Sequence, residues 1–429
     1  MKKLLSAGLV AVLATSAIAR QGPIPKGVPH LDHVWVIMME NHGFNQVLNN
    51  PAAPFTTQYA HSANLATNYF AVAHPSLTNY LEVNGGSNFG VLDDNAPDWH
   101  STACTANIVS GVANTEAVSA PICPITGEGT DAATPAIDYS NETSGPPGVN
   151  NIDGVKSYTA DSNILGMSIA DQLAHAGMTW KSYQESLPAS GADLVNYSDG
   201  NFTNLTDFTS LNAQIAASNA ANPTATLPTL STGNIVQLYA VKHDPFAYFK
   251  STQEGYNWGN SLKNIVPFDT DKGLFGDLAS GKVPNYSFIA PNQCNDQHGR
   301  GNGSVFCAYD PNDNGTQLGL NPALMTLGDQ ALQKIVTAIH ASPAWKEGNN
   351  AIVTIWDEDD YSVSPTVNRV AAIVDTNYPT HKKQSGVFYT HFSLLKTIEG
   401  AFGLPCLNHA CDASTAAMLD LFNPSHEWK

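Results

Sequence analysis

Short, almost continuous apolar runs are the feature that most constrains how this chain can fold. They lie over residues 33–39, 285–290, 351–356 and 370–374. Runs of this length without polar alternation are typical of strands covered on both faces, as in parallel sheets. Between the runs, apolar residues recur every three or four positions and predict helices over 169–176, 324–339 and 392–402. Strands alternating with helices predict an α/β fold with a mostly parallel, doubly wound sheet.

Composition and charge narrow the class of protein. Apolar residues make up 42% of the 429 residues, which is enough for a large core and excludes global disorder. The chain has 19 Lys and Arg against 37 Asp and Glu, a net charge of -18, and its basic residues are scattered. Because nucleic-acid phosphates are bound by clustered Lys and Arg, we expect no nucleic-acid binding.

The first 19 residues have the pattern of a secretory signal peptide. Two lysines follow Met1, residues 4–13 are apolar, and Ala-Ile-Ala at 17–19 is a small-residue cleavage site. We expect the mature chain to be exported to the periplasm or the extracellular medium. A retained anchor helix is the alternative, but the apolar stretch is short, and no later segment has the roughly 20 apolar residues that a membrane span needs. We therefore expect no transmembrane anchor.

Two stretches rich in Gly, Pro, Asn and Ser interrupt the pattern, over residues 141–153 and 217–234. The second could be a linker between domains. A strand-like segment resumes after it, however, and the later motifs fit the same sheet. We therefore expect residues 20–429 to form a single catalytic domain with inserted loops in its middle region.

Six cysteines fall into three couples that are close in sequence. In an oxidising compartment such couples are expected to form disulfides that close short loops. Proximity is the only argument for this connectivity, and a zinc cluster is disfavoured because no Cys-x-x-Cys pair occurs. The predicted pairs are Cys104–Cys123, Cys294–Cys307 and Cys406–Cys411.

Polar side chains follow three of the apolar runs at the point where each run ends. In chain order they are Glu40, Asn41 and His42; Asp296 and His298; and Asp357 and Glu358. Because the carboxyl ends of parallel strands meet at one edge of a sheet, we expect these side chains to converge there. Taken singly, each cluster has an ordinary solvated loop as its alternative.

The acidic residues of this set favour a metal site. Like charges a few ångströms apart cannot all ionise, and a divalent cation removes that repulsion. Glu40, Asn41, Asp357 and Glu358 offer only oxygen ligands, which suit Mg²⁺, Ca²⁺ or Mn²⁺ better than Zn²⁺. A solvated acidic turn over 357–360 is the alternative.

A second group mixes oxygen and nitrogen ligands. Asp296 and His298 lie two positions apart, and His391 precedes the helix predicted from residue 392. These three residues could bind a second metal or contact phosphate directly. For a single histidine such as His391, ordinary hydrogen bonding is the alternative.

Ser76 is the candidate nucleophile. Pro75 immediately before it predicts a helix start, and the positive end of a helix lowers the pKa of a hydroxyl and attracts an anion. A plain N-cap serine is the alternative. No nucleophile elbow, P-loop or dinucleotide-binding glycine motif competes for the chemistry.

Taken together, the motifs resemble the phosphoesterase family, which contains secreted acid phosphatases and bacterial phospholipases C. The resemblance runs in order from about residue 31 to 404. It rests on residues 36–44, 67–70, 74–80, 168–173, 242–246, 291–298, 356–360 and 391–395. Membership implies an alkaline-phosphatase-like fold, a three-layer sandwich with metal sites at one edge of the central sheet.

The resemblance also implies roles for individual residues. Ser76 matches the family's nucleophile, Asn79 is expected to steady the phosphoryl oxygens, and His298 or His391 to protonate the leaving group. The metal ligands expected beside the nucleophile are Glu40, Asn41, Asp357 and Glu358. The residues that resemble the superfamily's second metal site are Asp296, His298 and His391, although Asp296 and His298 lie closer in sequence than their counterparts. The histidines expected to line the phosphate pocket, each with a structural hydrogen bond as its alternative, are His42, His74 and His243.

The implied activity is hydrolysis of phosphate monoesters, with a small phosphorylated substrate. Ser76 would attack phosphorus in line, and water would release phosphate from the phosphoserine. A phospholipase C that cleaves the phosphodiester of phospholipid head groups is the alternative, disfavoured because no long C-terminal extension is present. An inactive exported binding protein is a remote alternative, since Ser76, Glu40 and the pair at 357–358 are all retained.

Overall fold

The computed structural model describes residues 21–74, 76–89, 164, 166–187, 239–255, 259–299, 307–312, 314–359, 368–379 and 382–423, with residues 216 and 220 and the short strands β3 (Thr105–Ala106) and β4 (Ile122–Cys123). The predicted signal peptide, most of the expected inserted loops and Cys104 lie outside the described residues. The predicted pair Cys104–Cys123 therefore lies outside them as well.

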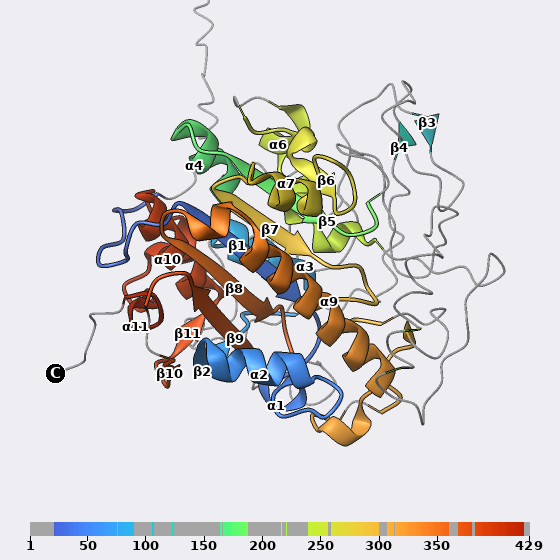
Figure 1. Ribbon diagram of the computed structural model, residues 1–429. Helices are drawn as coiled ribbons and strands as arrows, with labels where there is room; N and C mark the ends of the chain where they lie inside the picture. The colour runs from blue at the N-terminus through green and yellow to red at the C-terminus, as the bar shows by residue number, and fades with distance from the viewer. Residues whose placement is uncertain are drawn as a thin grey trace, which may run out of the picture.

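One sheet organises the described chain (Figure 1). Across the sheet the strands are β10 (Gln384–Ser385), β2 (Asn64–Phe70), β9 (Arg369–Thr376), β8 (Asn350–Trp356), β1 (His33–Met39), β7 (Tyr286–Ala290), β5 (Trp180–Gln184) and β6 (Ile265–Pro267). A further strand, β11 (Tyr389–Thr390), also pairs with β2. Only β9 pairs antiparallel with its neighbours, β8 and β2, among the pairings of this sheet in the described chain. The sheet is therefore mostly parallel, as the sequence predicts.

Helices cover both faces of the sheet. The α-helices are α1 (Phe44–Val47), α2 (Pro54–Ser62), α3 (Ser76–Gly85), α4 (Ile169–His175), α6 (Lys250–Glu254), α7 (Leu274–Ser280), α9 (Pro322–Ala341), α10 (His391–Phe402) and α11 (Leu419–Phe422). Helix α9 packs with α2 and α7, whereas α3 packs with α10 and α4. Figure 1 shows α9 crossing in front of the sheet and α3 behind it, which confirms the predicted three layers.

Short 3-10 helices connect several of these elements. They are η2 (Val241–His243), η3 (Pro245–Tyr248), η4 (Leu262–Asn264), η5 (Gln317–Gly319), η6 (Ala344–Lys346) and η7 (Asn408–Cys411). Of these, η2 matters most for the site, because its residue His243 contacts Glu40, which follows β1, and Asp296, which follows β7.

The central strands form where the apolar runs predict them. β1 has the predicted bounds, and every residue after His33 is buried. The whole of β8 is buried as well. Because helices cover both faces, neither strand has a solvent side that would favour alternating polar residues. The run over 370–374 also forms a strand, β9, but the sequence pattern did not indicate its antiparallel direction.

Local signals fix the start of the longest helix. In α9, Pro322 occupies the first turn, and the side chain of Asn321 accepts a hydrogen bond from the Ala323 N–H at 3.1 Å. Further along, the buried carboxylate of Asp329 accepts the N–H groups of Phe55 at 3.0 Å and Thr56 at 2.6 Å. This side chain satisfies the otherwise unpaired donors at the start of α2 and ties the two helices together.

Two predicted disulfides are present. Cys294 is bonded to Cys307 and Cys406 to Cys411, each pair with Cα atoms 5.2 Å apart. The first bond holds the loop that follows β7. Within the described residues, none of the helices combines the length and apolar character that crossing a bilayer would require.

Candidate active site

The carboxyl ends of several parallel strands meet at one edge of the sheet. Glu40 follows β1, Asp357 follows β8, and the segment from 291 to 298 follows β7. β2 runs in the same direction and leads through a short connection to Ser76, the first residue of α3. His391 follows β11. The expected convergence of these side chains is therefore a consequence of strand direction.

Glu40 lies at the centre of the site. Its side chain is fully buried; Oε2 accepts a hydrogen bond from Ser76 Oγ at 3.1 Å, and Oε1 lies 3.0 Å from Nε2 of His243. Burial raises the pKa of Glu40 well above its usual value, and the nearby carboxylates of Asp357 and Asp296 raise it further. Glu40 thus joins two groups of residues. We call His74, Ser76, Asp357 and Glu358 the serine side, and Lys242, His243, Asp296 and His298 the histidine side.

On the serine side, Glu358 gathers three partners. Its Oε1 accepts a hydrogen bond from Ser76 Oγ at 3.3 Å. Its Oε2 lies 2.8 Å from Nδ1 of His74 and accepts the Asn79 Nδ2 amide at 3.1 Å. The hydroxyl of Ser76 is therefore held between two carboxylates at the positive end of a ten-residue helix.

Asp357 is fixed from several directions. Asn41 has φ 54°, a left-handed conformation that Asn tolerates, and its N–H donates to Asp357 Oδ1 at 2.9 Å. The backbone N–H of Asp357 donates to the Met39 carbonyl at 2.9 Å. Burial raises the pKa of the Asp357 carboxyl, and the hydrogen bond from Asn41 offsets part of that rise.

His391 lies behind Asp357. Its Nε2 is 2.7 Å from the Asp357 carbonyl oxygen, and its Nδ1 is 3.0 Å from the hydroxyl of Tyr69. A carbonyl only accepts, so Nε2 carries the proton and Nδ1 accepts from Tyr69. Burial lowers the pKa of His391 to about 4, so the ring is neutral near neutral pH. Nε2 therefore holds the backbone of Asp357, and the Tyr69 hydroxyl in turn holds the His391 ring.

On the histidine side, His243 bridges two carboxylates. Beyond its contact with Glu40, its Nδ1 lies 3.2 Å from Oδ2 of Asp296, and its ring stacks on Tyr80 at a centroid distance of 5.1 Å. Asp296 holds its own loop, because Oδ1 accepts the N–H of His298 at 2.7 Å. Burial is the main cause that raises the pKa of Asp296 well above its usual value.

Lys242 brings a buried positive charge to this group. Its side chain is almost fully buried, and Nζ lies 3.1 Å from Nε2 of His298. His298 Nδ1 is 2.9 Å from the Gly299 carbonyl oxygen, so Nδ1 donates there and Nε2 accepts from the ammonium. Lys242 also lowers the pKa values of Glu40 and Asp296, against the larger effect of burial.

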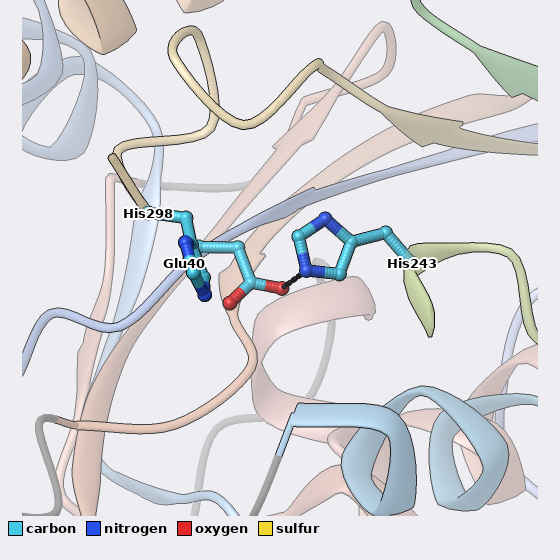
Figure 2. A group of neighbouring side chains, drawn as sticks. All are labelled: Glu40, His243 and His298. Carbon is cyan, nitrogen blue, oxygen red and sulfur yellow. Dashed lines mark ion pairs between the residues drawn. The ribbon is translucent and has the colours of Figure 1, made fainter. Parts of the chain in front are cut away.

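The site contains a buried group able to bind a metal ion. Ligand atoms of Glu40, His243 and His298 lie within 4.8 Å of one another, and Figure 2 shows the three side chains converging from separate segments. On the serine side, Asp357 Oδ2 is buried with no hydrogen bond from the described part of the chain. Several buried carboxylates with raised pKa values and an unsatisfied oxygen fit a divalent cation.

Asn79 and His42 have well-defined structural contacts. Asn79 Oδ1 accepts the N–H groups of Val72 at 3.1 Å and Ala73 at 3.0 Å, so it fixes the turn before Ser76. His42 Nδ1 lies 2.9 Å from the Glu40 carbonyl oxygen, and Nε2 lies 2.8 Å from Oδ2 of Asp310. Both residues adjoin the nucleophile or Glu40, and each supports the backbone there.

The structure brings most of the predicted residues together, but in a different grouping. His298 lies with His243 and Glu40, whereas His391 lies behind Asp357 on the other half of the site. The sequence pattern gave no role to Lys242 or Asp310. Lys242 could have been singled out from the sequence, because it lies in a mostly apolar segment, 239–249, and the chain has only 19 Lys and Arg. A lysine in such a segment is rarely buried without a partner. Asp310 carried none, since only tertiary contact pairs it with His42.

A sequence profile of the Phosphoesterase family matches residues 46–306, more than half of the 429 residues. The chain belongs to the Phosphoesterase family. The matched range includes Ser76, His243 and His298, and it confirms the family that the motifs resemble.

Curated relatives are distant in sequence. An acid phosphatase of Aspergillus fumigatus is 22% identical over 346 residues, covering 80% of this chain and 49% of the relative. A phosphatidylinositol-3-phosphatase of Mycobacterium tuberculosis is 23% identical over 421 residues, covering 94% and 90%. A phosphate-repressible acid phosphatase of Penicillium chrysogenum is 21% identical, covering 83% and 56%. The chain thus spans about half the length of these two fungal relatives.

Solved structures with a similar arrangement include a member of the alkaline phosphatase superfamily from Vibrio parahaemolyticus. That structure has a TM-score of 0.40 and 10% identity, covering 95% of this chain and 72% of its own. A phosphonate monoester hydrolase of Agrobacterium radiobacter has a TM-score of 0.43 and 9% identity, covering 92% and 78%.

Proposed function

We propose that this chain is an exported phosphatase that hydrolyses phosphate monoesters through Ser76. The observation that carries the proposal is the position of the Ser76 hydroxyl, buried at the start of α3 between the carboxylates of Glu40 and Glu358. A hydroxyl in such a place can reach phosphorus only if the negative charge around it is neutralised. Family membership supports chemistry at a phosphoric ester.

The serine side supplies the ligands for that neutralising charge. Glu40, Asp357 and Glu358 would hold a divalent cation with their carboxylate oxygens, with Asn41 beside them. The all-oxygen set favours Mg²⁺, Ca²⁺ or Mn²⁺. The group of Glu40, His243 and His298 would suit a softer ion such as Zn²⁺, as an alternative in which the ion replaces the contact between Lys242 and His298. When bound, the cation lowers the pKa of the hydroxyl and neutralises the phosphoryl oxygens.

The chain's own residues then perform the transfer. Ser76 Oγ forms a bond to phosphorus while the bond from phosphorus to the ester oxygen breaks, leaving a phosphoserine. Glu40 and Glu358 already accept hydrogen bonds from the hydroxyl, so either carboxylate can take up its proton. Asn79 holds the turn before Ser76 and thereby fixes the direction of attack.

We assign the histidine side to the leaving group. The departing alkoxide needs a proton, and Lys242 and His298 share one across a 3.1 Å contact. We propose that this pair donates the proton and that His243 helps to hold the phosphoryl group. In hydrolysis of the phosphoserine, the attacking water would give a proton to the pair as its oxygen bonds to phosphorus. The bond from phosphorus to Ser76 Oγ would break, and Ser76 would take back the proton held by the carboxylate. His391 has no free ring nitrogen in its described contacts, so we assign it a positioning role on Asp357.

Two further proposals concern organisation and location. The sheet combines strands from residues 33–39 through 389–390, which supports one catalytic domain within residues 20–429. The two disulfides in the described chain support an oxidising compartment, and with it export to the periplasm or the medium.

Hydrolysis of a matched monoester and diester of 4-nitrophenol tests the function. The purified chain is assayed between pH 4 and 9, with added divalent metals and after chelation. We expect turnover of the monoester, and loss of turnover on chelation that added metal restores. Preference for the diester would instead favour a phospholipase C, and no turnover of either ester with any metal would contradict simple phosphoester hydrolysis.

A further inference from the structure

Tyr309 is one of the few large apolar side chains on the surface of the described chain. Its exposed fraction is 43%, although its ring lies against the site. The ring centroid is 5.9 Å from that of His298, with the two planes inclined by 63°. His298 itself is 6% exposed and belongs to the buried group with Glu40 and His243. Tyr309 therefore stands where the buried site meets solvent.

The segment that carries Tyr309 is anchored on both sides. Before it, Cys307 is bonded to Cys294 in the loop after β7, and the Ala308 carbonyl accepts the Asn321 side-chain amide at 2.9 Å. After it, Asp310 Oδ2 lies 2.8 Å from Nε2 of His42. A ring held in this way needs little further ordering when a ligand packs on it.

Close backbone packing fixes the distance to the histidine side. Gly299, next to His298, has φ +82°, and a Cβ atom built there would lie 3.2 Å from both the Ala308 carbonyl oxygen and Tyr309 Cα. The backbone segments at Gly299 and at 308–309 are therefore in contact, and a side chain at position 299 would push them apart. Tyr309 is thus held beside the residue pair that we assign to the leaving group.

We propose that Tyr309 determines leaving-group specificity by packing against the apolar or aromatic part of the substrate ester. The inference rests on the proposed phosphatase function. With the phosphoryl group bound at Ser76, in-line attack directs the ester oxygen away from the serine. Ser76 contacts Oε2 of Glu40, whereas Oε1 contacts His243, whose ring centroid lies 5.6 Å from that of His298. His298 in turn contacts Lys242 and the half-exposed ring of Tyr309.

The test compares Tyr309→Ala and Tyr309→Phe with the wild type on 4-nitrophenyl phosphate and on glycerol 2-phosphate. The readout is the ratio of kcat/KM for the aryl ester to kcat/KM for the alkyl ester. We expect Tyr309→Ala to lower that ratio about two- to tenfold, as expected for the loss of one aromatic contact. Tyr309→Phe keeps the ring and is expected to keep the ratio.

A matched control and a separate inhibitor sharpen the result. Leu318 is 95% exposed, and Leu318→Ala is expected to leave both esters at wild-type rates. Inorganic phosphate has no leaving group that could contact Tyr309. Its inhibition constant in Tyr309→Ala is therefore expected to stay within roughly twofold of the wild-type value. Equal losses on both esters, or a parallel weakening of phosphate binding, would overturn the inference in favour of a structural role. A wild type that hydrolyses neither ester would instead overturn the proposed function, and the specificity role with it.

Discussion

The serine side and the histidine side share Glu40 but are built from different chemistry. The serine side combines a hydroxyl, carboxylates and one imidazole, and its residues come from the end of β8 and the start of α3. The histidine side adds a buried ammonium and two imidazoles, held by η2 and by a disulfide-anchored loop. The serine side therefore has carboxylates without a lysine or arginine among its named residues, whereas the histidine side includes the positive charge of Lys242.

This difference in charge suggests that the two sides have different roles in the reaction. Buried carboxylates without a cation repel one another, so we propose that a metal ion keeps the serine side charged and ordered. On the histidine side, Lys242 already lowers the pKa values of Glu40 and Asp296. We infer that the serine side activates the nucleophile and that the histidine side manages protons at the leaving group.

Removing Ser76, the proposed nucleophile, is expected to have the largest effect. Ser76→Ala should lower kcat on the order of 10³-fold or more, because it removes the hydroxyl that contacts both Glu40 and Glu358. The check is steady-state turnover together with mass spectrometry of acid-quenched protein, in which only the wild type should carry a phosphoserine. An unchanged rate with intact fold would remove Ser76 from the mechanism.

Neutralising the histidine side should come next. Lys242→Met is expected to lower kcat/KM about 10²-fold on an alkyl phosphate and less on an aryl phosphate, whose leaving group needs no proton. The aryl-to-alkyl ratio then rises, opposite to the change expected for Tyr309→Ala. Lys242→Arg retains the charge and serves as the matched control. Equal losses on both esters would mean that Lys242 acts on the phosphoryl group instead.

Metal removal should destabilise the serine side in a pH-dependent way. Folded-state pKa values of Glu40 and Asp357 are raised, so the folded chain binds more protons than the unfolded chain, and metal-free stability falls as pH rises above their ordinary values of 4.5 and 3.8. A cation at 100 times its dissociation constant adds about 2.7 kcal/mol. Chelation should therefore lower Tm more at pH 8 than at pH 5.

Thermal unfolding with and without chelator measures this difference. Glu40→Gln removes one of the repelling charges, so its chelated form should show a shallower fall of Tm with pH. A chelation effect that is equal at both pH values would argue that the cation does not sit among these carboxylates.

The smallest effect on activity is expected from changes at Tyr69 and His391, which lie behind Asp357. Tyr69→Phe removes the hydroxyl that donates to His391 Nδ1 and should cost about 1 kcal/mol of unfolding free energy, with less than about a tenfold change in kcat. His391 has a pKa of about 4 in the fold against an ordinary 6.5, so the unfolded chain binds the extra proton between these values. Stability should fall as pH drops from 6.5 to 4, and His391→Gln should flatten that fall in a urea titration.

Much of the fold follows from local sequence patterns. β1 and α9 could be placed because the first is apolar throughout and the second has an apolar stripe with an Asn-Pro start. The direction of β9 could not, since an apolar strand packs equally well in either orientation when both its faces are covered. The short β10 and β11 likewise depend on pairing with β2 rather than on their own residues.

For the site, the sequence alone determined which residues reach the carboxyl edge of the sheet. Glu40, Asp357 and the segment 291–298 follow apolar strands, and parallel strands end together, so their convergence is encoded locally. The sequence also determined two disulfides, because each joins cysteines that are close along the chain.

Only the tertiary structure decided which of these residues contact one another. His391 lies behind Asp357 and not beside His298, and Lys242 enters the site across 56 positions of sequence to reach His298. Such pairings depend on side-chain packing and charge balance in a buried space, where the nearest partner comes from another segment. Local patterns carry no record of that choice, because burial and opposite charge act only once the chain has folded.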